Sequence, residues 1–521
     1  MIIAPESLLK YSAIELSRAL HSRQVTAVDL MHETLQRIDV INPQINAVVS
    51  LEQNRDKLME EARFADELLD DAAAANKNAL TASFVSSDDW LRGIPMVIKD
   101  LEDVKGFPTT KGCPLYGTYH NDDESTSWHF DNATEDAPYV HRLRKAGAII
   151  IGKSNTPELG VGCHSYNPIF GTTMNPIDIS KAAGGSSGGA GAALSSHMFC
   201  ILDGSDMMGS LRNPAGWNGL YSLRPTVEWM EEEVVVVDDD VGDDHKVKMP
   251  WPMSTIGPMA RCPEDLAMML QTMIPTGREE LFDATSILDQ SGEELSRIVK
   301  GKTIGWLAGW GKDYLMETGV LEQCKESLDI FSKGSVDIQY VAAPLFSSKE
   351  LWEAWTDIRS HLIFNSLYEQ IDGDRCDVLP TLKERGVKAE VIYECERGFK
   401  LTKEQIHARL MTVHAWSKCV DDAFRRYDFL ALPSSQTYPF DASLDWPKTV
   451  AGKEMDTYHR WMEVMVPVTL LGLPCVTIPA GIGNSSGLPI GVQIFASKGS
   501  DAKLLRLACW YSRYLKGEYD K

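Results

Sequence analysis

Two glycine- and serine-rich stretches dominate this sequence: GGSSGGAGAAL at residues 184–194 and GSDMMGSLRNP at residues 204–214. The first stretch runs into AGAALSSHMF, which has the composition of a buried helix and not of a flexible linker. A phosphate-binding loop would need Lys-Ser or Lys-Thr after the glycines, where Ala190-Gly191 stands instead. Alone, the first stretch therefore fits a structural turn before a helix as well as it fits an active-site loop.

A nucleophile elbow is a further interpretation of the first stretch, because residues 184–188 match the pattern G-x-S-x-G. Such an elbow follows directly on an apolar strand, and the preceding DISKAA at 178–183 is not apolar. An esterase of the α/β-hydrolase type, with Ser186 as its nucleophile, stays open as an alternative.

Composition limits the classes of protein that the chain can belong to. Of 521 residues, 44% are hydrophobic and 24% are charged, which is typical of a globular protein with a sizeable core. The net charge of −23 argues against nucleic acid and anionic membrane surfaces as partners, because both attract basic faces. The start of the chain lacks the pattern of a secretory signal, and no apolar run reaches about 18 residues.

The ten cysteines are scattered along the chain without a CxxC pair. This spacing disfavours a zinc site, an iron–sulfur site or a disulfide scaffold, and it favours free, mostly buried thiols in a reducing compartment. No H-E-x-x-H motif or paired acidic cluster indicates a metal site. We therefore expect a cytoplasmic protein without a metal or other cofactor.

Helices and short apolar strands alternate in the first half of the chain. Ser12 and Thr26, each followed three residues later by an acidic residue, predict two helix starts. The second helix should bury one stripe, formed by Val28, Met31, Leu35 and Ile38, and end at Asn42-Pro43. Strands are predicted at residues 94–98, with Lys99 at the strand end, and at 148–151. This alternation predicts an α/β fold with a largely buried sheet.

Three polar stretches are expected to lie on the surface: residues 71–88, 120–136 and 228–246. The last reads EWMEEEVVVVDDDVGDDHK and fits a solvated loop or hairpin, with an acidic regulatory lid as the alternative.

Three motifs together resemble the amidase signature family of serine hydrolases, which use a Ser–cis-Ser–Lys triad. They are GIPMVIKD at 93–100, GGSSGG at 184–189 and GSDMMGSLR at 204–212, with 24 residues from Ser186 to Ser210 as in the family. GKSNTPE at 152–158, LRPT at 223–226 and the tail at 472–494 add to the likeness. It covers residues 10–260 and 455–512, whereas residues 275–450 show little of it.

The resemblance implies a single large domain over residues 1–521, built on a mixed, mostly buried central β-sheet with helices on both faces. Within it, residues 10–260 and 455–512 would form the common core, and residues 275–450 the region that varies with substrate. The resemblance also implies an amidase that hydrolyses the C–N bond of small aliphatic or aryl amides, and by the same acyl chemistry carbamates (urethanes) and esters. It implies no cofactor; a homo-oligomer is compatible with it.

Residue by residue, the resemblance makes Ser210 the nucleophile, Ser186 the bridging serine after a cis Gly185–Ser186 peptide, and Lys99 the base. A base must be neutral, so the pKa of Lys99 would have to fall from about 10.4 to about 7, a cost of roughly 4.6 kcal/mol that burial can supply. The resemblance further implies an oxyanion hole and supporting residues, as follows: the backbone of Met207, Met208, Gly209 and Ser210 for the oxyanion hole, and Ser187, Asp206 and Arg212 as supports, with Asp206 and Arg212 paired.

Two positions depart from the family pattern. Met208 replaces the usual glycine, so its side chain either narrows the pocket or fills core, and core is favoured. Asn213 follows Arg212 where relatives carry an apolar residue or glutamine, which makes the glutamine-hydrolysing subunit of a transamidase complex a poorer fit. Ser–His–Asp catalysis and a non-catalytic binding protein on the same fold are further alternatives. The histidines concerned are His164, His197, His245, His361, His407 and His414.

Overall fold

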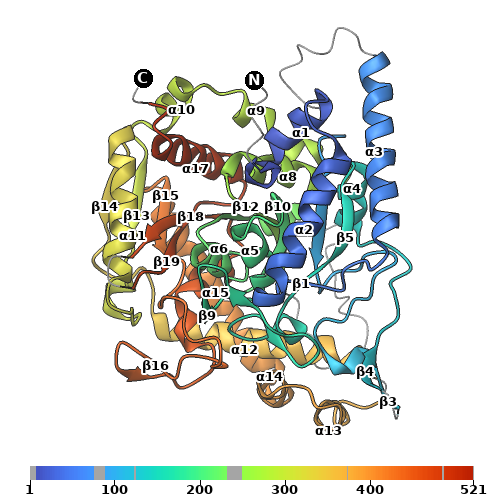
Figure 1. The fold of residues 1–521 in the computed structure, drawn as a ribbon. Helices are drawn as coiled ribbons and strands as arrows, with labels where there is room; N and C mark the ends of the chain where they lie inside the picture. The colour runs from blue at the N-terminus through green and yellow to red at the C-terminus, as the bar shows by residue number, and fades with distance from the viewer. Residues whose placement is uncertain are drawn as a thin grey trace.

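A computed structural model describes residues 7–75, 88–122, 125–230, 249–371, 373–483 and 486–519. Figure 1 shows a central sheet with helices packed around it. The largest sheet has eight strands in the order β10-β12-β11-β18-β19-β15-β13-β14. Only β13 forms parallel pairs, with β14 and β15, and the other neighbours are antiparallel. The strands are β10 (Ile201–Asp206), β12 (Thr255–Ala260), β11 (Tyr221–Arg224), β18 (Cys475–Ile482), β19 (Pro489–Phe495), β15 (Phe429–Pro433), β13 (Thr303–Trp306) and β14 (Asp337–Tyr340).

A second sheet of three strands lies against the edge of the first. Its order is β1 (Val48–Val49), β5 (Ile149–Ser154) and β2 (Pro95–Lys99), with β2 parallel to β5. Strand β2 contacts β10, the edge strand of the large sheet. At this seam the Lys99 N–H donates to the Asp203 side chain at 3.1 Å instead of to a neighbouring backbone. A buried carboxylate thus joins the two sheets beside Lys99.

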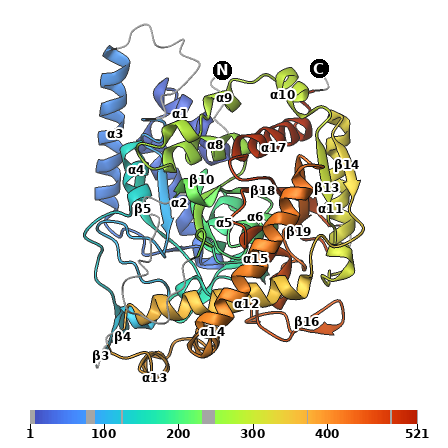
Figure 2. The same ribbon diagram turned by 180° about the vertical axis from the view of Figure 1, so that it is seen from behind.

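Helices cover both faces of the large sheet, as expected for the fold class. Helices α8 and α17 pack on one face and α5 and α6 on the other (Figures 1 and 2). The helices of the described chain are α1 (Ala13–His21), α2 (Ala27–Ile45), α3 (Arg55–Ala75), α4 (Pro138–Lys145), α5 (Gly188–Ser195), α6 (Arg212–Trp217), α7 (Val227–Met230), α8 (Pro263–Met273), α9 (Thr285–Leu288), α10 (Gly292–Val299), α11 (Val320–Asp329), α12 (Ser348–Tyr368), α13 (Val378–Glu384), α14 (Ala389–Lys400), α15 (Lys403–Phe424), α16 (Val466–Thr469) and α17 (Asp501–Leu515).

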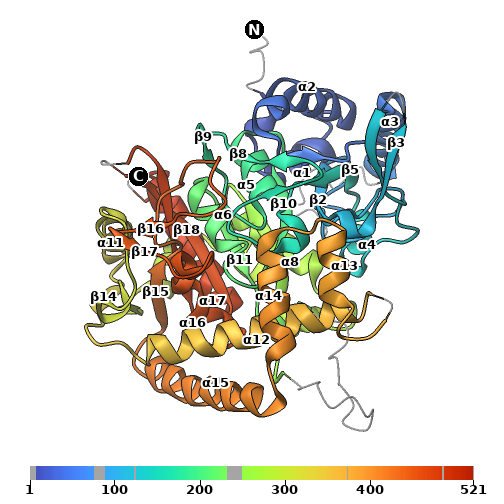
Figure 3. The ribbon, with the colours of Figure 1, turned by 90° about the horizontal axis from the view of Figure 1, so that it is seen from below.

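Residues 275–450 contribute to both the sheet and a separate helical layer. Strands β13, β14 and β15 from this region extend the large sheet. Helices α14 and α15 each pack on α12, and Figure 3 shows the three helices in front of the rest of the molecule. The region that resembles the family least is therefore part of the same sheet, and its helices α12, α14 and α15 form one cluster, apart from α9, α10 and α11 of the same region (Figures 1 and 3).

Most local predictions for the first helices are confirmed, with one correction. Ser12 caps α1, since its hydroxyl accepts from Glu15 N at 3.1 Å, and Thr26 caps α2 through Asp29 N at 3.0 Å. The predicted end of the second helix at Asn42-Pro43 is wrong, because α2 continues through Pro43 to Ile45. Pro43 removes only one backbone donor near the helix end, and Asn46 N still closes the last turn on Asn42 O at 2.8 Å.

The boundaries of other predicted segments shift by a few residues. Strand β2 covers 95–99 and β5 covers 149–154, against the predicted 94–98 and 148–151. Within the predicted surface stretches, α3 continues to Ala75, β3 (Thr118–Asp122) pairs antiparallel with β4 (Ser125–His129), and α7 reaches Met230. Residues 76–87 and 231–248, which hold most of the acidic stretch and His245, lie outside the described residues.

The cysteines lie in the structure as their spacing in the sequence predicts. All ten cysteines are unpaired and eight are buried, which confirms the expectation of free, mostly buried thiols. None of the helices in the described part of the chain is both long enough and apolar enough to cross a membrane.

Candidate active site

Lys99 ends β2 with its side chain fully buried, and its amine contacts three serine hydroxyls. The Nζ atom lies 2.6 Å from Ser186 Oγ, 3.0 Å from Ser187 Oγ and 2.9 Å from Ser205 Oγ. The structure therefore brings together Lys99 and the 184–189 loop, as the motifs predict. Ser205 is a neighbour of Lys99 that the sequence reasoning did not single out.

Ser186 and Ser187 are placed by the glycine-rich loop that precedes α5. The Gly185–Ser186 peptide bond is cis, at the position expected from the resemblance. Gly185 has no room for a side chain, because a Cβ there would lie 2.8 Å from the backbone Cα of His164. The Ser187 N–H donates to the carbonyl of Ser210 at 3.1 Å. This bond ties the two glycine–serine motifs directly together.

Asp206 organises the turn that carries Ser210 between β10 and α6. Its carboxylate accepts the N–H groups of Gly209 at 2.9 Å and Leu211 at 3.2 Å, and it pairs with Arg212 at 2.8 Å. The predicted Asp206–Arg212 pair is thus present, and both side chains are fully buried. Burial alone would raise the pKa of Asp206, but the charge and hydrogen bonds of Arg212 hold that pKa well below its usual range.

The backbone N–H groups of this turn are not all free. Because the Gly209 N–H is bonded to Asp206, it is not available to a ligand in this conformation. The N–H groups of Met207, Met208 and Ser210 have no acceptor among the described residues. The expected oxyanion donors therefore narrow from four residues to these three.

Burial lowers the pKa of Lys99 to about 8, and nearby carboxylates oppose a further fall. Asp203 is the strongest of these, ahead of Glu102 and Asp206. Asp203 is itself fully buried and is held by the Lys99 N–H and by the Tyr139 hydroxyl at 2.8 Å. The pKa of Lys99 is thus higher than the value of about 7 at which half of the Lys99 side chains would be neutral at pH 7.

A cavity of about 120 Å³ opens beside the serines, and its wall combines both motifs with α12. Met208 lines it and also packs in the hydrophobic core, so the two interpretations of this side chain are not exclusive. Of the described residues, no histidine and no tryptophan lines this cavity. The lining residues are Leu101, Leu159, Gly160, Val161, Gly162, Gly185, Ser186, Ser205, Met207, Met208, Ser210, Ser254, Arg359, Ile363 and Met462.

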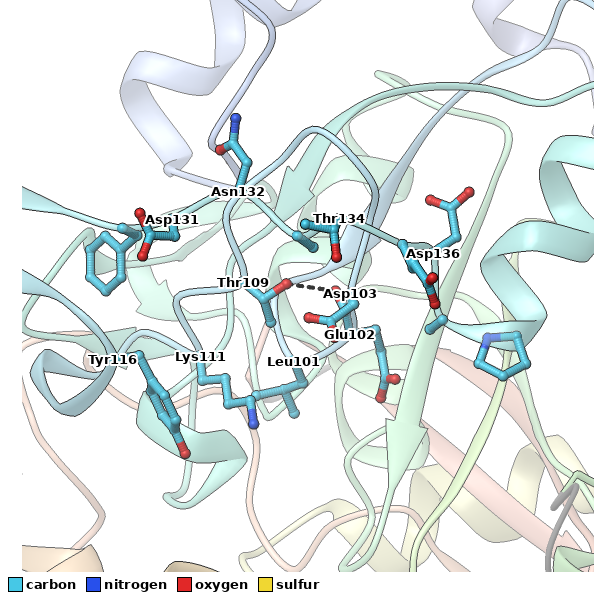
Figure 4. A pocket seen from close by; sticks show the side chains of 15 residues that line it. Leu101, Glu102, Asp103, Thr109, Lys111, Tyr116, Asp131, Asn132, Thr134 and Asp136 are labelled. Atoms are coloured by element: carbon cyan, nitrogen blue, oxygen red, sulfur yellow. Dashed lines mark hydrogen bonds between the residues drawn. The ribbon is translucent and has the colours of Figure 1, made fainter. Parts of the chain in front are cut away.

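A second cavity, of about 700 Å³, shares Leu101 with the first. Figure 4 shows Leu101, Lys111 and Tyr116 grouped on one side of it and Asp136 on the other. Glu102 also lines it, and the Glu102 carbonyl accepts a hydrogen bond from Thr109 at 3.3 Å. None of the three candidate triad residues lines this larger cavity.

Comparison with known proteins identifies the family. A model of the amidase family matches residues 29–505, which include both serine motifs and Lys99. The chain belongs to the amidase family. The recognition of the amidase signature in the sequence is thereby confirmed, and so is the enzyme class, a hydrolase of carbon–nitrogen bonds.

Individual members of the amidase family resemble the chain along nearly its whole length. An acylamidase from Rhodococcus erythropolis is 28% identical over 95% of this chain and 94% of that protein. A glutamyl-tRNA(Gln) amidotransferase subunit from Paenarthrobacter aurescens is 26% identical over 96% of this chain and 91% of that protein. The crystal structure of a bacterial aryl acylamidase covers 98% of both chains with a TM-score of 0.77 at 20% identity, which shows a shared fold.

Sequence reasoning missed Asp203, Ser205 and Arg359, three residues of the site. Ser205 stands two positions after Asp203 in β10, and period-two alternation places both on the same side of the strand, facing Lys99. That signal was present, but only the structure shows that β10 lies beside β2. Arg359 comes from α12, in the part of the chain without family motifs, and no local pattern marked it.

Proposed function

We propose that the protein is an amidase that hydrolyses the C–N bond of small amides through an acyl-enzyme on Ser210. The observation that carries this proposal is the 2.6 Å contact between Lys99 Nζ and Ser186 Oγ at the edge of a cavity that Ser210 also lines. A hydroxyl bonded to a buried amine can pass a proton between the nucleophile and the base.

In the proposed reaction, neutral Lys99 accepts the proton of Ser186 while Ser186 accepts the proton of Ser210. The Ser210 Oγ atom attacks the substrate carbonyl, and the N–H groups of Met207, Met208 and Ser210 stabilise the negative oxygen. When the tetrahedral intermediate collapses, the C–N bond breaks and the proton returns through Ser186 to the departing amine. Water then attacks the ester on Ser210 by the same proton path and releases the acid.

The remaining predicted residues, together with Ser205, have supporting roles in this proposal. Asp206 and Arg212 hold the Ser210 turn through the buried ion pair and the bond to Gly209 N. Ser187 and Ser205 hold Lys99 Nζ in place, at 3.0 and 2.9 Å. A carboxylate paired inside the protein resists protonation, so the turn should keep its shape over the working pH range.

Cavity size supports a small substrate. At about 120 Å³ the space beside the serines is below the roughly 300–1,000 Å³ of common ligand pockets, so it suits the reacting part of a small acyl group. Carbamates and esters present the same kind of carbonyl and belong to the proposed range. Because the chain has ten unpaired cysteines, we place the enzyme in the reducing cytoplasm.

Glutamine hydrolysis within a transamidase complex is a second candidate. Its support is the 26% identity to an amidotransferase subunit over 96% of the chain. This candidate predicts that glutamine is the preferred substrate and that a partner chain increases its turnover, whereas the first predicts turnover of simple amides by the isolated chain.

The test compares wild type with Ser210→Ala and Ser186→Ala on acetamide, acetanilide, ethyl carbamate and glutamine. Ser254→Ala is the control, because Ser254 lines the same cavity without contacting Lys99. We expect wild type and the control to release ammonia or amine, and both triad variants to lose more than about 10³-fold in kcat. Covalent labelling by a sulfonyl fluoride should fall on Ser210; a label on Ser186 would instead support the esterase alternative.

A further inference from the structure

Arg359 is the one charged residue among the described residues that line the cavity beside Ser210. It lies on α12 with Ile363 one turn further on, so both side chains face the same space. The Arg359 side chain is nearly buried, with 5% of its surface exposed. A buried guanidinium in the wall of a reaction cavity needs an explanation, because burying a charge is costly.

Contacts on two edges hold the Arg359 guanidinium in one orientation. Its Nε donates to Glu394 Oε1 at 3.0 Å, and its Nη2 donates to the Tyr458 hydroxyl at 3.1 Å. Glu394 is fully buried and also accepts from the Tyr458 hydroxyl at 2.5 Å and from Ser360. The Arg359 guanidinium is therefore held in one orientation by Glu394 and Tyr458, neither of which lines the cavity.

The third edge of Arg359 has only a weak partner. Its Nη1 points to the thioether sulfur of Met207 at 3.4 Å, and Met207 lines the cavity beside Ser210. A thioether is a poor acceptor for a guanidinium N–H, whereas a carbonyl oxygen is a strong one. A substrate oxygen that displaced the Met207 side chain would satisfy a donor that is now poorly satisfied.

Charge decides what kind of oxygen fits. Glu394 already balances the charge of Arg359, and that carboxylate stays ionised because Arg359 and the hydroxyl contacts lower its pKa against the effect of burial. A carboxylate ligand would thus bring an unbalanced charge into a mostly apolar cavity. An uncharged carbonyl brings none.

We propose that Arg359 selects amides that carry a second, uncharged carbonyl oxygen close to the scissile amide, and that Nη1 donates to this oxygen. The inference names the substrate class of the site and rests on the proposed function. Because the cavity is only about 120 Å³, the second carbonyl must lie within a few bonds of the first. Ketone, ester and amide carbonyls meet this requirement equally.

Three ligands of matched size test whether the site prefers an uncharged second carbonyl. They are 3-oxobutanamide, which has a second carbonyl; butanamide, which has none; and malonamate, which has a carboxylate. Dissociation constants are measured by ligand-observed NMR in the Ser210→Ala protein, so that binding is read without turnover. We expect 3-oxobutanamide to bind about 10-fold or more tightly than butanamide, the effect of one hydrogen bond to a charged donor. Malonamate should bind more weakly than 3-oxobutanamide.

The variant Arg359→Lys, on the same background, keeps a cation beside Glu394 but loses the fixed Nη1 donor. In this variant the dissociation constants of butanamide and 3-oxobutanamide should differ by no more than about twofold. Arg409→Lys is the matched control, because Arg409 pairs with Asp357 of the same helix α12 at 2.6 Å and does not line the cavity. The control should keep the full preference.

Equal binding of 3-oxobutanamide and butanamide overturns the inference before any variant is made. Tighter binding of malonamate, or a preference that survives in Arg359→Lys, also overturns it. Hydrolysis of the same amides by the protein with Ser210 intact is measured separately. Absence of hydrolysis would count against the proposed function, while the binding preference would still decide the role of Arg359.

Discussion

Replacing Asp203 by asparagine tests the electrostatics of the proposed base most directly. Asparagine keeps one oxygen to accept from the Lys99 N–H, and its amide NH2 then faces the Tyr139 hydroxyl, which can accept as well as donate; the buried negative charge is removed. That charge favours the protonated form of Lys99, so removing it should lower the pKa of Lys99 from about 8. If neutral Lys99 is the working base, the rising limb of the pH–rate profile should move to lower pH.

The magnitude follows from the fraction of neutral Lys99. With a pKa of about 8, roughly a tenth of Lys99 is neutral at pH 7 and nine-tenths at pH 9, so kcat/KM of wild type should rise about tenfold between these values. A nearby charge shifts a pKa by roughly one unit or more, which would leave about half of Lys99 neutral at pH 7 in Asp203→Asn. The variant should therefore be about fivefold faster at pH 7 and equal to wild type above pH 9.

The assay is the initial rate of ammonia release from one primary amide between pH 6 and 10. Asp265→Asn is the control: Asp265 is also a fully buried carboxylate that accepts backbone N–H groups, from Ala13 at 2.7 Å and Ile14 at 3.0 Å, but it lies on α8 away from Lys99. The rising limb of the pH–rate profile of Asp265→Asn should stay at the same pH as in wild type. A limb that also stays there in Asp203→Asn, or that moves to higher pH, would refute the reasoning.

Three further substitutions test the site and its frame. Ser205→Ala removes one of three hydroxyls from Lys99 Nζ and should lower kcat about 3- to 30-fold, well short of the loss in Ser186→Ala; equal losses would assign Ser205 to the proton path. Asp206→Asn breaks the buried pair with Arg212 and should lower the free energy of unfolding in urea by about 3–5 kcal/mol at pH 7. Because the pKa of Asp206 is lower in the folded than in the unfolded protein, its ionised form stabilises the fold fully above the unfolded pKa near 3.9. The difference in unfolding free energy between wild type and Asp206→Asn should therefore shrink as pH falls below about 4. A difference that stays constant down to pH 3 would contradict the role of the Asp206–Arg212 pair. Met207→Ala enlarges the cavity and should raise kcat/KM for benzanilide relative to acetanilide, while an unchanged ratio would show that Met207 does not limit the acyl group.

The candidate triad could be predicted from sequence because each member belongs to a short local motif. Lys99 follows an apolar strand, and Ser186 and Ser210 stand in glycine-rich turns whose spacing matches one family. The Asp206–Arg212 pair was equally accessible, since the two residues flank one turn. The contacts of Asp203 were not, because they depend on β2 and β10 lying side by side, and neither strand encodes its neighbour. Arg359 was further out of reach, since helix periodicity indicates which residues share a face but not which cavity that face meets.

The two buried aspartates near Lys99 differ in which positive charges balance them, and this difference sets the pH range in which the proposed base, Lys99, is neutral. Asp206 is paired with Arg212 and lies 3.6 Å from Arg224, so its charge is compensated whatever the state of Lys99. The direct contacts of Asp203 are two uncharged donors, the Lys99 N–H and the Tyr139 hydroxyl. When Lys99 loses its proton, the ammonium group no longer balances the charge of Asp203. This cost favours the protonated form of Lys99 and holds its pKa at about 8, although the side chain is completely buried. An enzyme with this arrangement should reach its full rate in mildly alkaline solution, and one neutral residue at position 203 should be enough to move that range towards pH 7.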